Sequence, residues 1–136
     1  MNSFNSEYFK EKINSIREKF STCTPYMTTL SDIVRQKILL ILAESGTDGM
    51  DVQDITAKTH LSRPAISHHL RILKDAGMII SHKKGTQIYY FIYIQNALES
   101  LMDLIATVEN LVSNIDMESV KENAPWMIAD KSADAK

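Results

Sequence analysis

Apolar residues recur along most of this chain at the three- and four-residue spacing that is typical of amphipathic helices. The segment at 30–45 is apolar around most of its circumference, which is typical of a buried central helix. Ser21 to Thr24 followed by Pro25 is expected to end the first helix. The periodicity predicts helices at about residues 4–20, 30–45, 50–58, 63–76 and 97–115.

The two middle helices carry start and stop signals on either side of a short turn. Asp51 is suited to cap the shorter helix, with Asp54 three residues later as in a capping box. Ser62 is suited to cap the longer helix, and Pro64 lies in its first turn, where a missing N–H costs nothing. A short helix, the turn at 59–61 and a longer capped helix together predict a helix-turn-helix.

Two short segments rich in β-branched and aromatic residues follow Gly77. Residues 78–80 and 88–94 flank the basic stretch 83–87, so they predict a β-hairpin with a basic tip. A hairpin directly after the longer helix makes this a winged helix-turn-helix. The expected fold class is therefore mainly α with a small β-hairpin (α+β).

Charge is unevenly distributed along the 136 residues. Residues 51–94 carry six basic and three acidic side chains, whereas 95–136 carry three basic and eight acidic ones. A basic segment in an acidic chain suggests one surface that meets an anion. Cys23 is the single cysteine, which excludes an intrachain disulfide. No signal peptide is visible and no apolar run is long enough to span a bilayer, so a cytoplasmic protein without a membrane partner is expected.

The helix at 62–76 presents two different faces. Ile66, Leu70 and Leu73 form its inward stripe, and hydroxyl, imidazole and guanidinium groups occupy the opposite side. Such groups suit base edges and phosphates, and a helix in the major groove uses its N-terminal residues for bases. An ordinary solvated face is the alternative for this helix alone, but the basic wing at 78–94 favours DNA. The predicted DNA-binding residues are Ser62, Arg63, Pro64, Ser67, His68, Arg71, Lys74, Lys83, Lys84, Thr86 and Gln87.

Three stretches resemble the ArsR/SmtB repressors. Residues 67–79 resemble the recognition-helix signature of that family, 85–90 resemble its wing return, and 30–39 resemble its second helix. The resemblance covers about residues 28–94. It implies a homodimeric bacterial transcriptional repressor that leaves operator DNA when an effector binds. It also implies that Arg63, Pro64, Ser67 and His68 occupy base-reading positions.

The chain departs from the family at the metal-sensing positions. Residues 50–55 hold no Cys-x-Cys pair, and no histidine follows His82. Carboxylates alone are poor selective ligands for zinc, nickel or arsenic, so no metal site and no cofactor are expected. His69 is expected to be a partly buried, hydrogen-bonded residue. No nucleophile motif or glycine-rich phosphate loop is present, so no catalytic residues and no enzyme activity are expected.

The last predicted helix carries a heptad stripe that suits a dimer. Its apolar residues alternate at three- and four-residue spacing, and the alternative is that the stripe packs on its own domain. Burial of six aliphatic side chains is worth roughly 10–15 kcal/mol before entropy, which favours pairing with a second copy. The N-terminal helix is expected to support the pair. The predicted dimer residues are Phe9, Ile13, Leu98, Leu101, Ile105, Val108 and Val112.

These patterns predict a single winged-helix domain over 1–136. The domain consists of a dimerisation helix at 1–27, the winged core at 28–94, a second dimerisation helix at 95–116 and an acidic tail at 117–136. Trp126 belongs to an apolar island in that tail and is expected to anchor on the dimer. The predicted function is a dimeric repressor that reads palindromic double-stranded operator DNA, with an unknown effector. A winged-helix protein-interaction module and a metallosensor with an atypical site are the alternatives.

Overall fold

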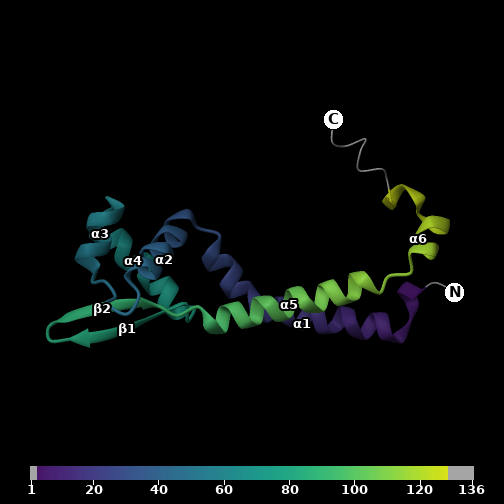
Figure 1. The fold of residues 1–136 in the computed structure, drawn as a ribbon, viewed down its shortest axis with the longest axis horizontal. Coiled ribbons are helices and arrows are strands. Elements are labelled where there is room, and N and C mark those ends of the chain that lie inside the picture. The colour runs from purple at the N-terminus through teal and green to yellow at the C-terminus, as the bar shows by residue number, and fades with distance from the viewer. Residues whose placement is uncertain (1–2, 129–136) are drawn as a thin grey trace.

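The computed structural model describes residues 3–128 as a winged core at one end of a two-helix stem (Figure 1). The core contains α2, α3, α4 and the β1–β2 hairpin, and α1 and α5 run side by side along the stem. The short helix α6 lies at the far end of the stem, near the N-terminus. Among these residues, no helix combines the length and apolarity needed to cross a bilayer.

Helix α1 spans Glu7–Leu30 and continues through Pro25, so the prediction that it ends near residue 20 is wrong. Proline removes one backbone hydrogen bond from a helix interior. Burial of Cys23 and Thr29 on either side of Pro25 offsets that loss. The Thr29 hydroxyl donates to the Pro25 carbonyl oxygen at 2.8 Å. The added turns bring Leu30 against the winged core.

Helix α2 spans Ile33–Ser45 and supplies the centre of the core. Ile38 and Leu42 are fully buried, as expected for a central helix, whereas Leu40 on its outer side is 67% exposed. Asp32 caps the helix by accepting from the backbone N–H of Arg35 at 3.0 Å. That hydrogen bond lowers the pKa of the Asp32 carboxyl below its usual value, and the Arg35 guanidinium adds to the effect.

The predicted helix-turn-helix is present in α3, Val52–Thr59, and α4, Arg63–Asp75. The Asp51 carboxylate accepts from the Asp54 N–H at 2.8 Å, and the Ser62 hydroxyl accepts from the Ala65 N–H at 3.3 Å. His60 joins the helices in a left-handed conformation with φ 59°. Both predicted caps are therefore confirmed.

The wing consists of β1, Ile79–Lys84, and β2, Gln87–Ile92, paired antiparallel with Lys84 opposite Gln87. Only Gly85 and Thr86 form the turn, and Gly85 has φ +64°, which suits the first central position of a type II′ turn. The strands therefore extend into the stretch that was predicted to be the tip.

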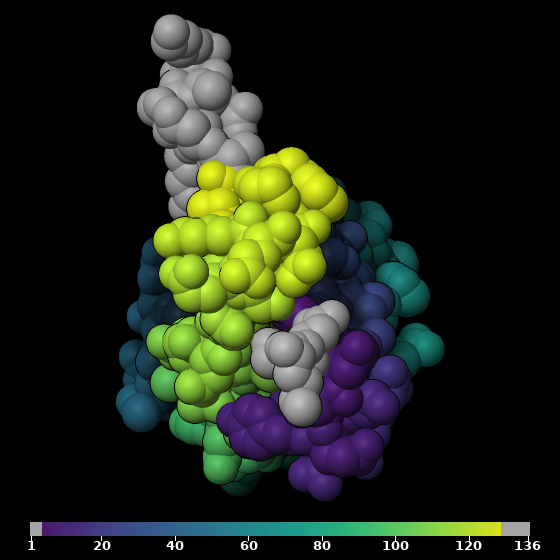
Figure 2. All heavy atoms as spheres, turned by 90° about the vertical axis from the view of Figure 1, so that its right-hand side faces the viewer, coloured from purple at the N-terminus to yellow at the C-terminus, as the bar shows by residue number. Residues whose placement is uncertain are grey.

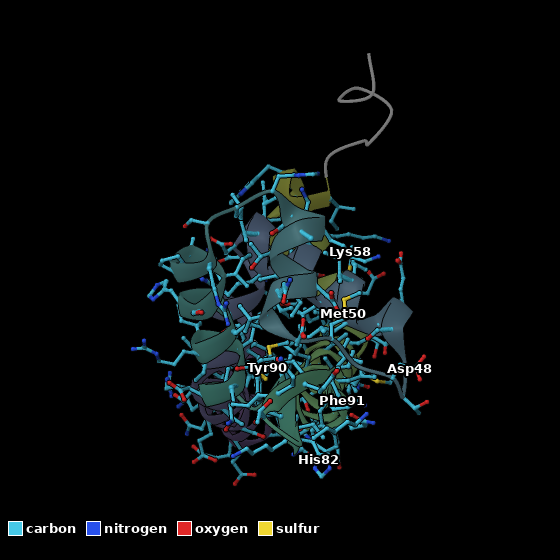
Figure 3. All side chains as sticks on the ribbon, turned by 90° about the vertical axis from the view of Figure 1, so that its left-hand side faces the viewer. Asp48, Met50, Lys58, His82, Tyr90 and Phe91 are labelled. Carbon is cyan, nitrogen blue, oxygen red and sulfur yellow. The ribbon has the colours of Figure 1, made fainter. Side chains whose placement is uncertain are left out.

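Met50 joins the wing to the core instead of starting α3 as predicted. It forms an isolated bridge with Tyr90, with backbone N···O distances of 3.1 and 2.7 Å (Figure 3). Gly49 precedes it with φ +68°, and a Cβ there would lie 2.6 Å from a Phe91 ring carbon. A side chain at Gly49 would therefore push the loop away from β2.

Helix α5, Gln95–Ser113, packs along α1 to form the stem. Ile16, Cys23, Leu104 and Leu111 are buried between the two helices. Polar contacts add to this packing, because the Cys23 thiol lies 3.3 Å from the Ser100 carbonyl oxygen and Lys19 pairs with Asp103. The stem therefore has a hydrophobic core of its own, separate from that of the winged end.

Three short elements complete the described chain: η1 (Ser3–Asn5), α6 (Met117–Asn123) and η2 (Pro125–Ile128). The predicted acidic tail thus begins with a helix, which Asp116 caps by accepting from the Glu118 N–H at 3.1 Å. Figure 2 shows α6 and η2 at the far end of the stem, next to α5. Residues 129–136 of the predicted tail lie outside the described residues.

Candidate nucleic-acid interface

The two faces of α4 have opposite environments. Ile66, Leu70 and Leu73 are at most 2% exposed in the core, whereas Ser67, His68 and Arg71 on the other side are all exposed. Burial of the inner stripe fixes the rotation of the helix about its axis. The polar face therefore points away from the protein, where it is free to meet a ligand.

The N-terminal turn of α4 is also open to solvent. Ser62, Arg63 and Pro64 are exposed, and Pro64 occupies the first turn, where its ring is compatible with the helix. Lys74 is exposed near the opposite end. The Arg63 guanidinium lies at the start of the helix, and the side chains of Arg71 and Lys74 lie about two and three turns further along.

Arg35 links the end of α1 to α4 through His69. Its side chain is 12% exposed and donates to the carbonyl oxygens of Thr29 at 2.8 Å and Thr28 at 3.3 Å. A further guanidinium nitrogen lies 3.4 Å from Nδ1 of His69. His69 is thus partly buried and hydrogen-bonded, as predicted, and its neighbour His68 faces solvent. Sequence reasoning did not find Arg35, because its role depends on a contact 34 residues away.

The wing carries its two lysines on opposite faces. Lys84 folds back over β2, with its ammonium nitrogen 4.9 Å from the Tyr89 ring centre and 5.6 Å from that of Phe91. Lys83 pairs across the strand with Ile88 and therefore projects from the other face. The two lysines thus flank the wing near its end, and Thr86 and Gln87 are exposed at and beside the turn.

The predicted DNA-binding residues come together at one end of the molecule. Helix α4 and the wing both belong to the winged end, and β1 contacts α4 (Figure 1). The acidic α6 lies at the opposite end of the stem. The charge difference along the sequence therefore becomes a separation in space, with the basic groups gathered around α4 and the wing.

The predicted dimer residues divide into two groups. Phe9, Ile13, Leu101 and Val108 pack against the core of their own stem. Leu98, Ile105 and Val112 remain 49%, 64% and 58% exposed along α5. Part of the heptad stripe is thus buried within the stem of the same chain. The other three residues form an apolar stripe on the outer side of α5 that the described residues leave exposed.

Within residues 3–128, no three His, Cys, Asp or Glu side chains lie close enough to hold a metal ion together. His68 and His69 are neighbours with ring centres 5.7 Å apart, but they point in different directions from α4.

Known proteins are similar to this chain in sequence and in fold. Residues 32–81 match the family model described as "Bacterial regulatory protein, arsR family". The transcriptional repressor SdpR of Bacillus subtilis is 39% identical over 84 residues, which are 60% of this chain and 90% of SdpR.

Two solved structures share the winged helix-turn-helix fold. The ArsR family transcriptional regulator RHA00566 aligns with TM-score 0.61 at 19% identity, covering 71% of this chain and 95% of the other. The homodimeric winged helix-turn-helix DNA-binding domain Mb0332 of Mycobacterium bovis aligns with TM-score 0.52 at 24% identity, covering 67% and 81%.

Proposed function

This chain belongs to the ArsR family of bacterial regulatory proteins, whose members regulate transcription by binding DNA, and we propose that it is a homodimeric repressor of a palindromic operator. The observation that carries this proposal is the division of α4 into a buried apolar face and an exposed face of hydroxyl, imidazole and guanidinium groups. Because the proposed ligand is operator DNA, we expect this protein to act in the cytoplasm.

In the proposed complex, the start of α4 enters the major groove. Arg63 is the candidate reader of guanine, because its guanidinium fork matches O6 and N7 together. Ser67 and His68 lie one turn further along the same face and complete the base-contacting set with Pro64. Arg71 and Lys74, nearer the end of the helix, are suited to phosphates, which position the protein without specifying sequence. The Ser62 cap holds the first turn of the helix in shape.

The wing supplies a second set of contacts beside the helix. Lys83 and Lys84 flank the hairpin on opposite faces, so a wing lying along the DNA backbone would place cationic groups on both of its sides. Thr86 and Gln87 at the turn add hydrogen-bonding groups. These contacts are electrostatic for the most part and are expected to be indifferent to sequence.

A two-fold axis would present two copies of α4 to one duplex. The exposed stripe on α5 is the proposed centre of the dimer, and the half-sites would then lie one helical turn, or about 34 Å, apart. Effector identity is left open in this proposal. No cofactor and no catalytic step are proposed, since members of the family act by binding. The relatives found are transcriptional regulators, so they do not favour a protein-interaction module. A metallosensor with an atypical site is not proposed, because residues 50–55 hold no Cys-x-Cys pair and no histidine follows His82.

Arg63→Ala is expected to weaken operator binding by about 1–3 kcal/mol per half-site and to relax preference at one base position of each half-site. The reason is the loss of a bidentate contact that distinguishes guanine from other bases. Fluorescence anisotropy titrations with the operator duplex and with a series of its single-base variants measure the affinity and the base preference. Arg17 is an exposed arginine on α1, so Arg17→Ala is the matched control and should leave all of these affinities unchanged. Unaltered base preference in Arg63→Ala would show that α4 is placed wrongly on the DNA.

Replacing Lys83 and Lys84 together by alanine is expected to weaken binding about equally for operator and random duplex. Each lost phosphate contact should reduce the slope of log affinity against log salt by about 1, so the dimer loses up to about 4. Titrations at several salt concentrations give the slope. Lys10→Ala with Lys121→Ala removes the same charge from α1 and α6 and should change the slope little. Equal slopes for the two double variants would contradict a role for the wing.

A further inference from the structure

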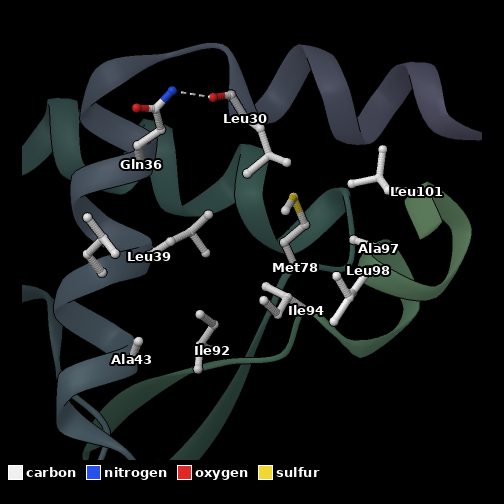
Figure 4. A pocket seen from close by; sticks show the side chains of 11 residues that line it. Leu30, Gln36, Leu39, Ala43, Met78, Ile92, Ile94, Ala97, Leu98 and Leu101 are labelled. Atoms are coloured by element: carbon white, nitrogen blue, oxygen red, sulfur yellow. Dashed lines mark hydrogen bonds between the residues drawn. The ribbon is translucent and has the colours of Figure 1, made fainter. Parts of the chain in front are cut away.

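The apolar surface of the molecule includes a cavity where the winged core meets the stem. It has a volume of about 430 Å³ and lies between the end of α1, the outer side of α2, the base of the wing and the first turns of α5 (Figure 4). Leu39, Leu40, Met78, Ile92 and Leu98 are among its lining residues. Leu40 and Leu98 are 67% and 49% exposed, so apolar side chains lie open at this cavity.

The chemistry of the lining excludes a polar ligand. Gln36 is the one polar side chain among the described residues that line the cavity. Its amide nitrogen already donates to the Leu30 carbonyl oxygen at 2.6 Å (Figure 4). A small polar molecule would find only the Gln36 amide to orient it, whereas an apolar protein segment needs only matching shape and area. The occupant is therefore expected to be an apolar stretch of protein.

An apolar stretch without a partner lies at the other end of the stem. Trp126 and Met127 of η2 are 73% and 70% exposed, and Met117 at the start of α6 is 49% exposed. Among the described elements, α6 packs mainly against η2 and makes few contacts with the stem helices. In one chain this segment cannot reach the cavity, because α5 separates them by about 28 Å of helix.

The symmetry of the exposed stripe on α5 brings the two features together between copies. Leu98 and Val112 each lie seven residues from Ile105, so the stripe is symmetric about Ile105. Antiparallel pairing of two α5 helices around an axis at Ile105 sets Leu98 of one copy opposite Val112 of the other. Residues 114–116 link α5 to α6 and span at most about 11 Å. The partner's α6 thus begins close to the cavity.

We infer that α6 and η2 of each copy pack across the partner's cavity in the dimer, with Trp126 as the main apolar group that closes it. This inference rests on the proposed dimer and adds a specific site to it. An aromatic side chain of this size buries about 150–250 Å². The exchange of segments would connect the stem of one copy to α2 and the base of the wing in the other.

Intermolecular cross-linking tests the inference with two full-length variants, Leu40→Cys and Met127→Cys, purified separately and then mixed under mild oxidation. The mixture is expected to form a disulfide-linked dimer, and each variant alone is not. Cys23 is 1% exposed and does not compete. If the mixture forms no link although native mass spectrometry shows the mixed dimer and that dimer binds the operator, the inference is overturned and the proposed function stands. If no dimer forms at all, both the inference and the proposed dimeric repressor are contradicted.

Trp126 also reports on the site directly, because it is the single tryptophan of the chain. Its emission in the wild-type dimer is expected to be blue-shifted and protected from acrylamide, and Leu40→Asp should remove both effects while the dimer persists. Ile80→Asp is the control, because Ile80 projects from the opposite face of the hairpin to the cavity-lining Ile92. Solvent-exposed emission in the wild-type dimer, with a hydrophobic dye bound in the cavity instead, would overturn the inference in favour of a small apolar ligand.

Discussion

Ile105→Asp is expected to convert the proposed dimer to monomers and to reduce operator affinity by about 10²–10⁴-fold. Ile105 is 64% exposed at the midpoint of the apolar stripe on α5, so a two-fold axis there would set two aspartates against each other in an apolar contact. Monomers lose the effective concentration with which the first bound half-site presents the second α4 to DNA. Sedimentation velocity gives the oligomeric state, and anisotropy with a two-half-site duplex gives the affinity.

Asn110→Asp is the matched control for this prediction. It adds the same charge to the same helix, but Asn110 lies outside the apolar stripe and its side chain is exposed. It should leave both the mass and the affinity close to wild type. The α5 stripe would not be the dimer interface if Ile105→Asp sedimented as a dimer at wild-type stability.

Leu70→Ala is expected to lower the free energy of unfolding by about 2–5 kcal/mol. Leu70 is 2% exposed and packs with Ile38, Ile66 and Leu73 beneath the polar face of α4. Truncation leaves a cavity that close-packed neighbours cannot fill. Urea unfolding at a fixed protomer concentration measures the change, because the stability of a dimer depends on concentration.

His68→Ala provides the comparison on the same helix. Its side chain is exposed, so unfolding should shift by no more than about 0.5 kcal/mol, while operator binding weakens. The two variants therefore separate the structural face of α4 from the proposed reading face. Equal losses of stability for Leu70→Ala and His68→Ala would contradict this division.

The winged core could be predicted from sequence because its signals are local. Ser62 and Asp51 cap the helices that they precede, and the spacing of Ile66, Leu70 and Leu73 marks the buried face. Strand-forming residues marked the wing, but the first strand, predicted at 78–80, continues to Lys84. Lys83 and Lys84 look like loop residues in isolation, and the pairing of Lys84 with Gln87 extends both strands.

The departures from prediction come from packing between distant segments. Pro25 normally ends a helix, but α1 continues because Cys23 and Thr29 are buried around it, and a single sequence does not reveal that environment. The heptad stripe on α5 indicated a dimer. It did not show that Leu104 and Leu111 pack against α1, which leaves the outer side of α5 for a partner.

The candidate site shows the same contrast. Every predicted DNA-binding residue is exposed at the winged end, and this followed from helical periodicity and the hairpin. Arg35 was not predicted, although it connects the end of α1 to His69 on α4. Its contacts offer a physical route by which a change in the stem would reach the proposed recognition helix.

Selection of bound duplexes from a random pool by the wild-type protein tests the central claim most directly. The proposed dimer should enrich an inverted repeat whose half-site centres lie about 10–10.5 base pairs apart. Selection with Arg63→Ala should then lose one base preference in each half. Enrichment of a single unrepeated site, or of no sequence at all, would contradict a two-fold reader built on the outer face of α4.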